Sequence, residues 1–206
     1  MLAKNPWHGY EAIELKNKGK QQRSRETIKT ILGAAAQVLI EQGYEKATTN
    51  RIAECAGYSV GTLYQYFDDK EDIYGELIDQ ALVELLRAAV NCPIQASLEE
   101  TLQELLARVI SGLEQNPALI QALQELLVGQ FRYKRNAAYE SIIASTTRLL
   151  EAHRREIFVD DLSLAARIIV GAAEGVVNSV EIELMHSDEL EAHLLRLQFA
   201  YLTQKN

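Results

Sequence analysis

The chain has 206 residues, of which 48% are hydrophobic, 24% are charged and only three are proline. This composition is typical of a folded globular protein and excludes collagen-like, disordered and disulfide-scaffold classes. The abundance of Ala, Leu, Glu and Gln, with only four Phe, argues against a β-sandwich or barrel. We therefore expect an all-α fold of about nine helices.

Cysteine, histidine and hydropathy patterns indicate no metal site and no membrane span. Cys55 and Cys92 lie 37 positions apart, without CxxC or Cys/His spacing, and the four histidines lack metal-ligand spacing. No apolar run approaches the roughly 18 residues that cross a bilayer, and the first 22 residues lack the apolar core of a signal peptide. We expect a cytoplasmic protein without a cofactor and without a membrane partner.

The net charge of −8 is unevenly distributed. Residues 1–70 carry ten Lys/Arg against eight Asp/Glu, whereas residues 71–206 carry eleven against twenty-one. Between positions 16 and 29 the only acidic residue is Glu26, whereas six residues are basic: Lys16, Lys18, Lys20, Arg23, Arg25 and Lys29. Such a cluster can neutralise phosphates, although a solvated arm without a ligand has the same composition. We assign residues 1–23 to a flexible basic arm.

The first two predicted helices follow this arm. Apolar residues recur at three- and four-residue spacing from about Thr27 and predict a helix that Gly43 ends. Thr48 or Thr49 can cap a second helix of barely two turns, which Gly57 ends.

Two further helices complete a recognisable arrangement. Ser59 can cap a third helix from Val60 to about Tyr66. A fourth helix begins near Lys70, capped by the preceding aspartates, and runs toward Asn91. Two short helices joined by a glycine-containing turn have the geometry of a helix-turn-helix.

The remaining helices are longer. Ser97 to Glu100 reads as a capping box that opens a helix to about Gln115, and Asn116-Pro117 opens the next. Helix is expected from Ala118 to about Glu156 with an interruption near Gly129, then over about 162–184, and finally after the cap Ser187. The last helix has two apolar stripes, one for its own core and one for a second subunit, so we expect a homodimer.

The third helix has the character of a DNA-reading helix. Leu63 and Phe67, four positions apart, form its expected anchor line, so that Gly61, Thr62, Tyr64 and Gln65 point away from the core. Thr, Tyr and Gln side chains suit hydrogen bonds to phosphates and base edges. The alternative is that Tyr64 and Tyr66 pack against neighbouring helices.

Lys70 supplies a separate indication. It stands in the first turn of a helix, where the helix dipole favours anions over a lysine. A DNA phosphate at this position would be bound by the backbone amides and by Lys70 together. Alternatively, Lys70 pairs with Asp68 or Asp69 on the surface.

The sequence here resembles the DNA-binding domain of the tetracycline-repressor (TetR) family over about residues 24–75. The matching residues are Gly43-Tyr44, Ala47-Thr48-Thr49, Arg51-Ile52-Ala53, the run Ala56-Gly57-Tyr58-Ser59-Val60-Gly61-Thr62-Leu63-Tyr64-Gln65-Tyr66-Phe67, and Lys70-Glu71-Asp72-Ile73. The resemblance implies an all-helical homodimer with an N-terminal three-helix DNA-binding domain and a C-terminal helical domain for dimerisation and inducer binding. It assigns residues 24–70 and 71–206 to these two domains.

Position by position, the resemblance assigns DNA contacts to Thr48, Asn50, Ser59, Val60, Gly61, Thr62, Tyr64, Tyr66 and Lys70. Val60 and Asn50 stand where many members have polar or basic residues, and Asp68-Asp69 places acid near the DNA backbone. The operator sequence therefore does not follow from the resemblance.

The ligand pocket is predicted from inward positions of the middle helices. The assigned residues are Leu106, Val109, Leu113, Leu127, Phe131, Tyr139, Ile143, Glu174 and Asn178. The apolar members could equally be plain core. Glu174 and Asn178 lie four apart on an otherwise apolar helix and need partners, which could be an inducer, the second subunit or water.

The sequence therefore predicts a ligand-responsive repressor that binds a palindromic double-stranded DNA operator and is released by a small-molecule inducer, either apolar or cationic. A DNA-binding architectural or cell-division regulator acting through a protein partner is the alternative, and a visible cavity would count against it. We expect no enzymatic activity, because the sequence contains no catalytic dyad, phosphate loop or metal cluster.

Overall fold

The computed structural model describes residues 18–114, 117–177, 179 and 188–205. Within these ranges the regular structure is entirely helical, as the composition predicts. Most of the predicted basic arm, Asn178 and the cap Ser187 lie outside the described residues. None of the described helices is long and apolar enough to cross a membrane.

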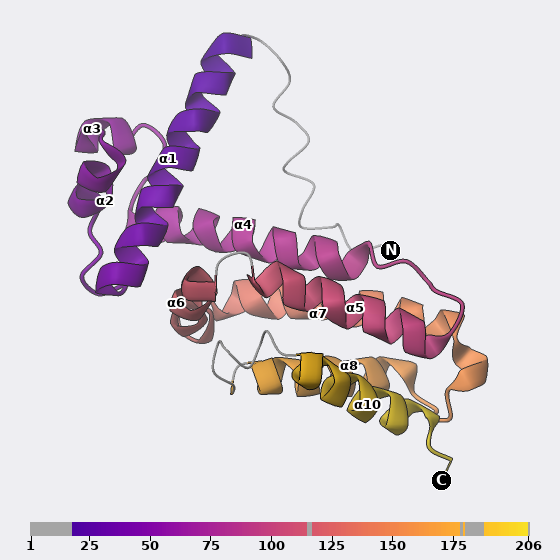
Figure 1. The fold of residues 1–206 in the computed structure, drawn as a ribbon. Helices are drawn as coiled ribbons and strands as arrows, with labels where there is room; N and C mark the ends of the chain where they lie inside the picture. Colours follow the sequence, from indigo (N-terminus) through magenta and orange to yellow (C-terminus); the bar gives the residue numbers. More distant parts are fainter. Residues whose placement is uncertain (1–17, 115–116, 178, 180–187, 206) are drawn as a thin grey trace.

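The N-terminal part consists of α1 (Lys18–Gln42), α2 (Thr49–Ala56) and α3 (Val60–Leu63), with α2 and α3 lying beside α1 (Figure 1). We call these three helices the head. Gly43 ends α1 and Gly57 ends α2, both with positive φ, of 75° and 72°. These left-handed positions are readily adopted by glycine, which has no Cβ. The predicted ends of both helices are confirmed.

The start of α1 differs from the prediction. The helix begins at Lys18 and not near Thr27, so residues 18–23 are helical and do not belong to a flexible arm. The apolar periodicity used for the prediction does not detect a polar helical turn, but Lys, Gln, Arg and Glu are good helix formers. In Figure 1 this first part of α1 extends beyond α2 and α3.

A compact core joins the head to α4 (Lys70–Val90). Leu63 and Phe67 are buried in it together with Ile31, Ile52 and residues of the first turns of α4. The side chain of Tyr74 in α4 is completely buried, and its hydroxyl donates a hydrogen bond to the carbonyl of Ala35 at 3.1 Å. The first half of α4 therefore shares one core with the head.

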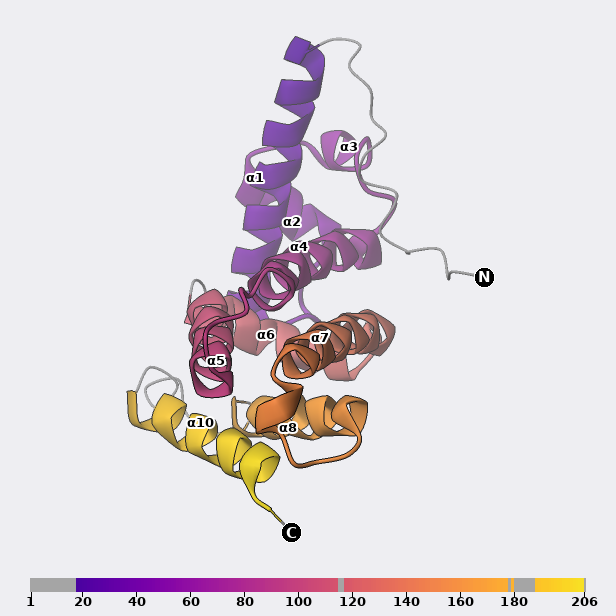
Figure 2. The ribbon, with the colours of Figure 1, turned by 90° about the vertical axis from the view of Figure 1, so that its right-hand side faces the viewer.

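The C-terminal part, which we call the body, is layered. It contains α5 (Leu98–Glu114), α6 (Pro117–Val128), α7 (Arg132–Ala152), α8 (Leu162–Val177) and α10 (Asp188–Thr203). Figures 1 and 2 show α4 above α5 and α7, with α8 and α10 below them. The principal contacts are α4 with α5 and α7, α7 with α8, and α10 with α5.

Local capping signals place these helices where the sequence predicts them. Asp69 caps α4 by accepting a hydrogen bond from the Asp72 amide at 2.7 Å. Ser97 caps α5 through the Glu100 amide at 3.2 Å, and Pro117 is the first residue of α6. The predicted interruption near Gly129 separates α6 from α7.

A buried polar network joins the start of α5 to the end of α7. His153 is 7% exposed; its Nδ1 lies 2.9 Å from Glu156 Oε1 and its Nε2 lies 2.8 Å from Thr101 Oγ1. The Glu156 carboxylate also accepts a hydrogen bond from the Leu98 amide at 3.2 Å. His153 is therefore a structural residue that positions two helices of the body.

Candidate functional site

The outer face of α3 is exposed as the anchor-line prediction requires. Leu63 and Phe67 are buried, whereas Gly61, Tyr64 and Gln65 are exposed and Thr62 is half-buried. The backbone continues beyond Leu63 through tightened turns, with the Gln65 and Tyr66 amides donating to the Thr62 and Leu63 carbonyls. A short polar helix face is therefore available to a partner, and this prediction is confirmed.

Hydrogen bonds within the head hold several of these polar groups in place. Ser59 Oγ accepts from the Thr62 amide at 3.0 Å and lies 2.8 Å from Thr62 Oγ1. Thr48 caps α2 by accepting from the Arg51 amide at 3.3 Å. The hydroxyls are therefore already oriented in the unbound chain, which would reduce the side-chain entropy lost on binding a partner.

The two tyrosines of this region differ. Tyr64 is 52% exposed, and its hydroxyl lies 3.2 Å from that of Thr49 on α2. Tyr66 and Val60 are partly buried against the core of the head. The alternative reading as packing residues therefore describes Tyr66, whereas Tyr64 presents its ring to solvent.

Lys70 is held by Tyr44 and not by the neighbouring aspartates. Its Nζ donates to the Tyr44 carbonyl at 3.2 Å and lies 3.9 Å from the centre of the Tyr44 ring. Burial raises the pKa of Tyr44 to about 12, so its neutral hydroxyl donates to Glu71 at 2.9 Å. The Tyr44 ring in turn packs edge-on against Tyr74. The ammonium group of Lys70 is thus tied to the buried core.

Taken together, the nine predicted DNA-contacting residues lie on the start of α2, on α3 and its flanks, and on the first turn of α4. Five are exposed: Thr48, Asn50, Ser59, Gly61 and Tyr64. The other four are half-buried: Val60, Thr62, Tyr66 and Lys70.

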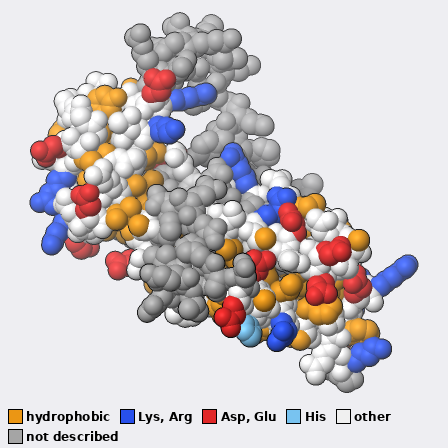
Figure 3. Space-filling view, viewed as in Figure 1, with side chains coloured by type: hydrophobic (Ala, Val, Ile, Leu, Met, Phe, Trp, Pro, Cys, Tyr) orange, Lys and Arg blue, Asp and Glu red, His pale blue; other side chains and the backbone are white. Residues whose placement is uncertain are grey.

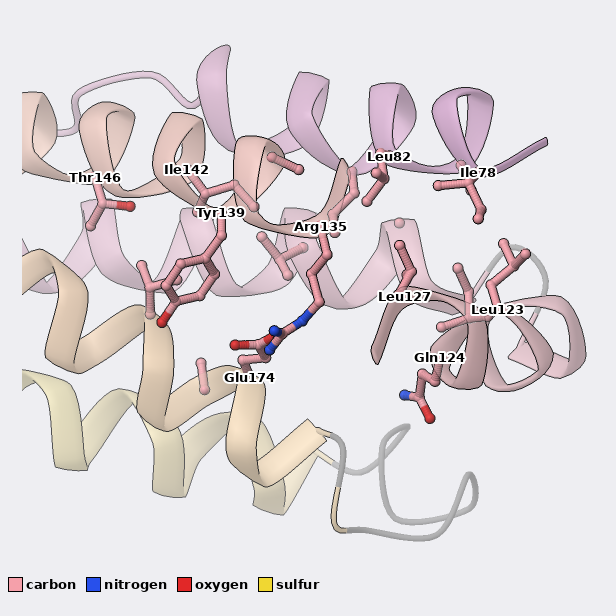
Figure 4. A pocket seen from close by; sticks show the side chains of 18 of the residues that line it. Ile78, Leu82, Leu123, Gln124, Leu127, Arg135, Tyr139, Ile142, Thr146 and Glu174 are labelled. Atoms are coloured by element: carbon pink, nitrogen blue, oxygen red, sulfur yellow. The ribbon is translucent and has the colours of Figure 1, made fainter. Parts of the chain in front are cut away.

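A cavity of about 720 Å³ lies in the body, between α4, α5, α6, α7, α8 and α10. Its walls are mainly aliphatic, with Ile78 and Leu82 from α4 facing Leu123 and Leu127 from α6 (Figure 4). Its volume lies in the range of pockets that bind drug-sized molecules.

Few polar groups enter this cavity. Arg135 on α7 pairs with Glu174 on α8, with Nη2 and Nε lying 2.5 Å and 3.0 Å from Glu174 Oε1. Tyr139 lies one turn further along α7, and burial raises the pKa of its phenol, which therefore stays neutral. Gln124, Glu125, Thr146 and Gln198 complete the polar lining.

The structure brings together part of the predicted pocket. Leu106, Val109, Leu127, Tyr139 and Glu174 line the cavity. Glu174 forms an ion pair with Arg135 of the same chain, whereas the sequence predicted an inducer, the second subunit or water as its partner. The side chain of Leu113 and residue Asn178 lie outside what the structure describes.

Two predicted pocket residues lie elsewhere. Phe131 precedes α7 and is buried in the core shared by the head and α4, where its ring borders Gly75. Ile143 is buried with Leu98 and Leu150, because it lies about 100° around α7 from the cavity residue Ile142. Both were assigned from hydrophobicity, which does not distinguish the two sides of a helix that is buried on both.

Several lining residues were missed. Ile78, Leu82 and Leu85 recur at helical spacing on α4, and this pattern could have placed them in the body. No sequence pattern predicts that Arg135 and Thr146 line the cavity, because a lone polar residue in a helix is usually exposed.

Comparisons with known proteins agree with this architecture. Residues 31–77 match the family model described as bacterial regulatory proteins, tetR family. Residues 97–202 match the model of the tetracyclin repressor-like C-terminal domain.

Curated relatives match part of the chain. The fatty acid metabolism regulator protein of Bacillus subtilis (strain 168) is 31% identical over 97 residues, 46% of this chain and 50% of that protein. The nucleoid occlusion factor SlmA of Haemophilus ducreyi is 26% identical over 117 residues, 54% of each chain. The chain thus spans about half the length of the curated relatives it matches.

Solved structures share the fold over most of the chain. The fatty acid degradation regulator FadR of Bacillus halodurans superposes with a TM-score of 0.70 at 24% identity, covering 90% of this chain and 97% of that one. FadR of Bacillus subtilis, solved in complex with stearoyl-CoA, gives 0.70 at 23% identity, covering 84% and 98%.

Proposed function

The chain belongs to the tetracycline-repressor family of bacterial transcriptional regulators, and on this premise we propose that it is a repressor released from its operator by a small molecule. One observation carries the proposal: α4 packs against the head and also forms part of the cavity wall. Its first turn carries Lys70, which contacts Tyr44 between α1 and α2, and its middle carries Ile78 and Leu82 in the cavity wall. A ligand in the cavity therefore touches the helix that positions the head.

We assign DNA binding to residues 24–70, through the nine positions on α2, α3 and the start of α4, and regulation and dimerisation to residues 71–206. The α3 helix would enter the major groove, with Thr62 near base edges and with Tyr64 and Lys70 at phosphates. A homodimer presents two such helices, so the operator is expected to be palindromic.

Release would depend on the separation of the two heads. Operator half-sites lie about 34 Å apart or a multiple of one helical turn, so a small tilt of α4 is enough to lose one set of contacts. The ligand must bind the two arrangements with different affinity, and coupling of about 1–3 kcal/mol is typical.

The exposed apolar surface of α8 and α10 supports dimerisation there. Leu164, Ile168 and Leu197 are 53%, 42% and 50% exposed in the single chain. Figure 3 shows hydrophobic side chains exposed among Asp and Glu on the body. On α8, Gly171 faces Tyr139 of its own chain, whereas Gly175 is exposed.

The mainly aliphatic cavity favours an apolar ligand, and the acidic composition of residues 71–206 favours a cationic ligand over an anionic one. The relatives support an apolar chain, since one is named for fatty acid metabolism and one was solved with stearoyl-CoA. The partial match to a nucleoid occlusion factor is the support for a regulator acting through a protein partner. A cavity of about 720 Å³ favours ligand control over that alternative.

The proposal is tested by selecting operators from random DNA with the full chain. Tyr64→Ala and Lys70→Ala should weaken binding to all selected sequences by similar factors, whereas Thr62→Ala should change the preferred base at particular positions. Tyr133→Ala is the matched control, because this tyrosine is 65% exposed but lies on α7 in the body. Equal binding by all four variants and the parent would refute the DNA-contact assignment.

A further inference from the structure

Thr146 is an unsatisfied polar group in the cavity wall. The residue is 1% exposed, and among the described residues its hydroxyl has no hydrogen-bond partner. Its neighbours on α7 behave differently: Ser145 and Thr147 donate to the carbonyls of Ser141 and Ile143, at 3.0 Å and 2.8 Å. Because burying an unpaired hydroxyl is unfavourable, the position indicates a partner supplied by a ligand.

Thr146 lies at one end of the row of lining residues, which we call the inner end of the cavity. The lining residues Ile169 and Gln198 are almost completely buried, at 1% and 5%, whereas Val128 is 70% exposed. Figure 4 shows Thr146 at one end of the row of labelled residues and Ile78 and Leu123 at the other. Arg135 and Thr146 are eleven positions apart on α7, which corresponds to about 16 Å. The cavity is therefore long enough for an extended aliphatic chain.

The charges in the wall favour an uncharged occupant. Arg135 and Glu174 neutralise each other within the lining, and the remaining charged lining residue, Glu125 on α6, is exposed. An ionised ligand group near Thr146 would have to separate the Arg135–Glu174 pair or remain without a counter-ion, and both are unfavourable in a largely apolar site. A neutral ligand leaves the pair intact.

We propose that the cavity binds an uncharged, extended aliphatic molecule whose oxygen, at the inner end, accepts a hydrogen bond from Thr146. A ketone or ester of medium chain length has this chemistry. The proposal rests on the proposed function, since it names the class of ligand for the same cavity. It differs from an acyl-CoA, whose phosphates would need basic partners.

The first experiment measures binding to the purified full chain by displacement of N-phenylnaphthylamine, a neutral apolar fluorophore. The competitors have equal chain length: methyl nonyl ketone, undecane, undecanoate and undecyltrimethylammonium. We expect the ketone to bind about tenfold more tightly than undecane, and more tightly than both ions, because one buried donor becomes paired.

Two variants separate the hydroxyl from the shape of the wall. Thr146→Val keeps the volume and removes the hydroxyl, so the preference for the ketone over undecane should disappear. Thr147→Val is the matched control, because it removes a neighbouring hydroxyl that is bonded to its own helix, and the preference should persist. A ketone preference that survives Thr146→Val, or equal binding of ketone and undecane to the parent, would overturn the proposal.

A second readout distinguishes this inference from the proposed function. Operator binding is measured with and without each compound. If the ketone binds through Thr146 but releases no DNA, the neutral-ligand proposal is supported and the proposed release of the operator by a ligand is wrong. If only undecanoate or the ammonium compound binds and releases the operator, ligand control stands and the neutral ligand is wrong. If no compound binds, the neutral-ligand proposal is wrong.

Discussion

At the scale of single residues, the contact between Gly171 and Tyr139 shapes the cavity. A Cβ on Gly171 would lie 2.9 Å from the Tyr139 hydroxyl oxygen, so the end of the tyrosine side chain would have to shift. Gly171→Ala should therefore displace the tyrosine, weaken ligand binding and lower the free energy of unfolding by about 1–3 kcal/mol. Denaturant unfolding and probe displacement measure the two effects.

Two further variants test the cause. Adding Tyr139→Phe to Gly171→Ala removes the clashing oxygen and should recover most of the lost stability. Gly33→Ala, at an exposed position of α1 where a Cβ meets nothing within 4 Å, should instead raise stability by about 0.5–1 kcal/mol through helix propensity. Similar losses in both alanine variants would show that the contact with Tyr139 has no role.

At the scale of elements, α7 links the cavity to α4. Lys134 forms a half-buried ion pair with Asp79 on α4, and the next residue, Arg135, reaches Glu174 in the cavity. We predict that Lys134→Gln leaves probe binding unchanged but reduces the ligand-induced loss of operator affinity by several-fold. Operator titrations with and without the releasing compound measure this coupling.

Loss of the pair also leaves Asp79 without its cation, which by itself destabilises the body. The double variant Lys134→Gln with Asp79→Asn removes both charges and should restore stability without restoring coupling. Full coupling in the double variant would show that this ion pair does not transmit the ligand signal.

Because α1 begins at Lys18, a deletion that ends before this residue tests whether the preceding lysines contact DNA. Deleting residues 1–17 leaves α1 whole and removes Lys4 and Lys16. For each of these lysines that contacts a phosphate, the slope of log affinity against log salt should become shallower by about 0.9. An unchanged slope would assign no DNA contact to this segment.

At the scale of the whole molecule, the exposed apolar residues Leu164, Ile168 and Leu197 on α8 and α10 predict a dimer. Ile168→Glu places a charge between Leu164 and Gly175 on one face of α8, and burial of that charge in an interface is strongly unfavourable. Light scattering should show a monomer whose operator affinity falls by more than tenfold. Tyr133→Glu, on an exposed position of α7, should remain dimeric. A dimeric Ile168→Glu would place the interface elsewhere.

The sequence alone determined the features that depend on neighbours within about four positions. The caps Thr48, Ser59 and Asp69 and the glycine at position 57 specify their helix ends through local hydrogen bonds and backbone conformation. The spacing of Leu63 and Phe67 likewise determines which side of α3 faces outward. The helix-turn-helix and its exposed face could therefore be predicted, although α3 ends at Leu63 and not near Tyr66.

Only the tertiary structure decided the cavity, because its walls come from six helices that are distant in the sequence. Arg135 and Glu174 are 39 positions apart, and no local pattern pairs them. Phe131 and Ile143 are as hydrophobic as residues that do line the cavity, yet the packing of α7 directs them into solid core. Hydrophobic burial is non-directional, so it selects inward positions without specifying which of them face empty space.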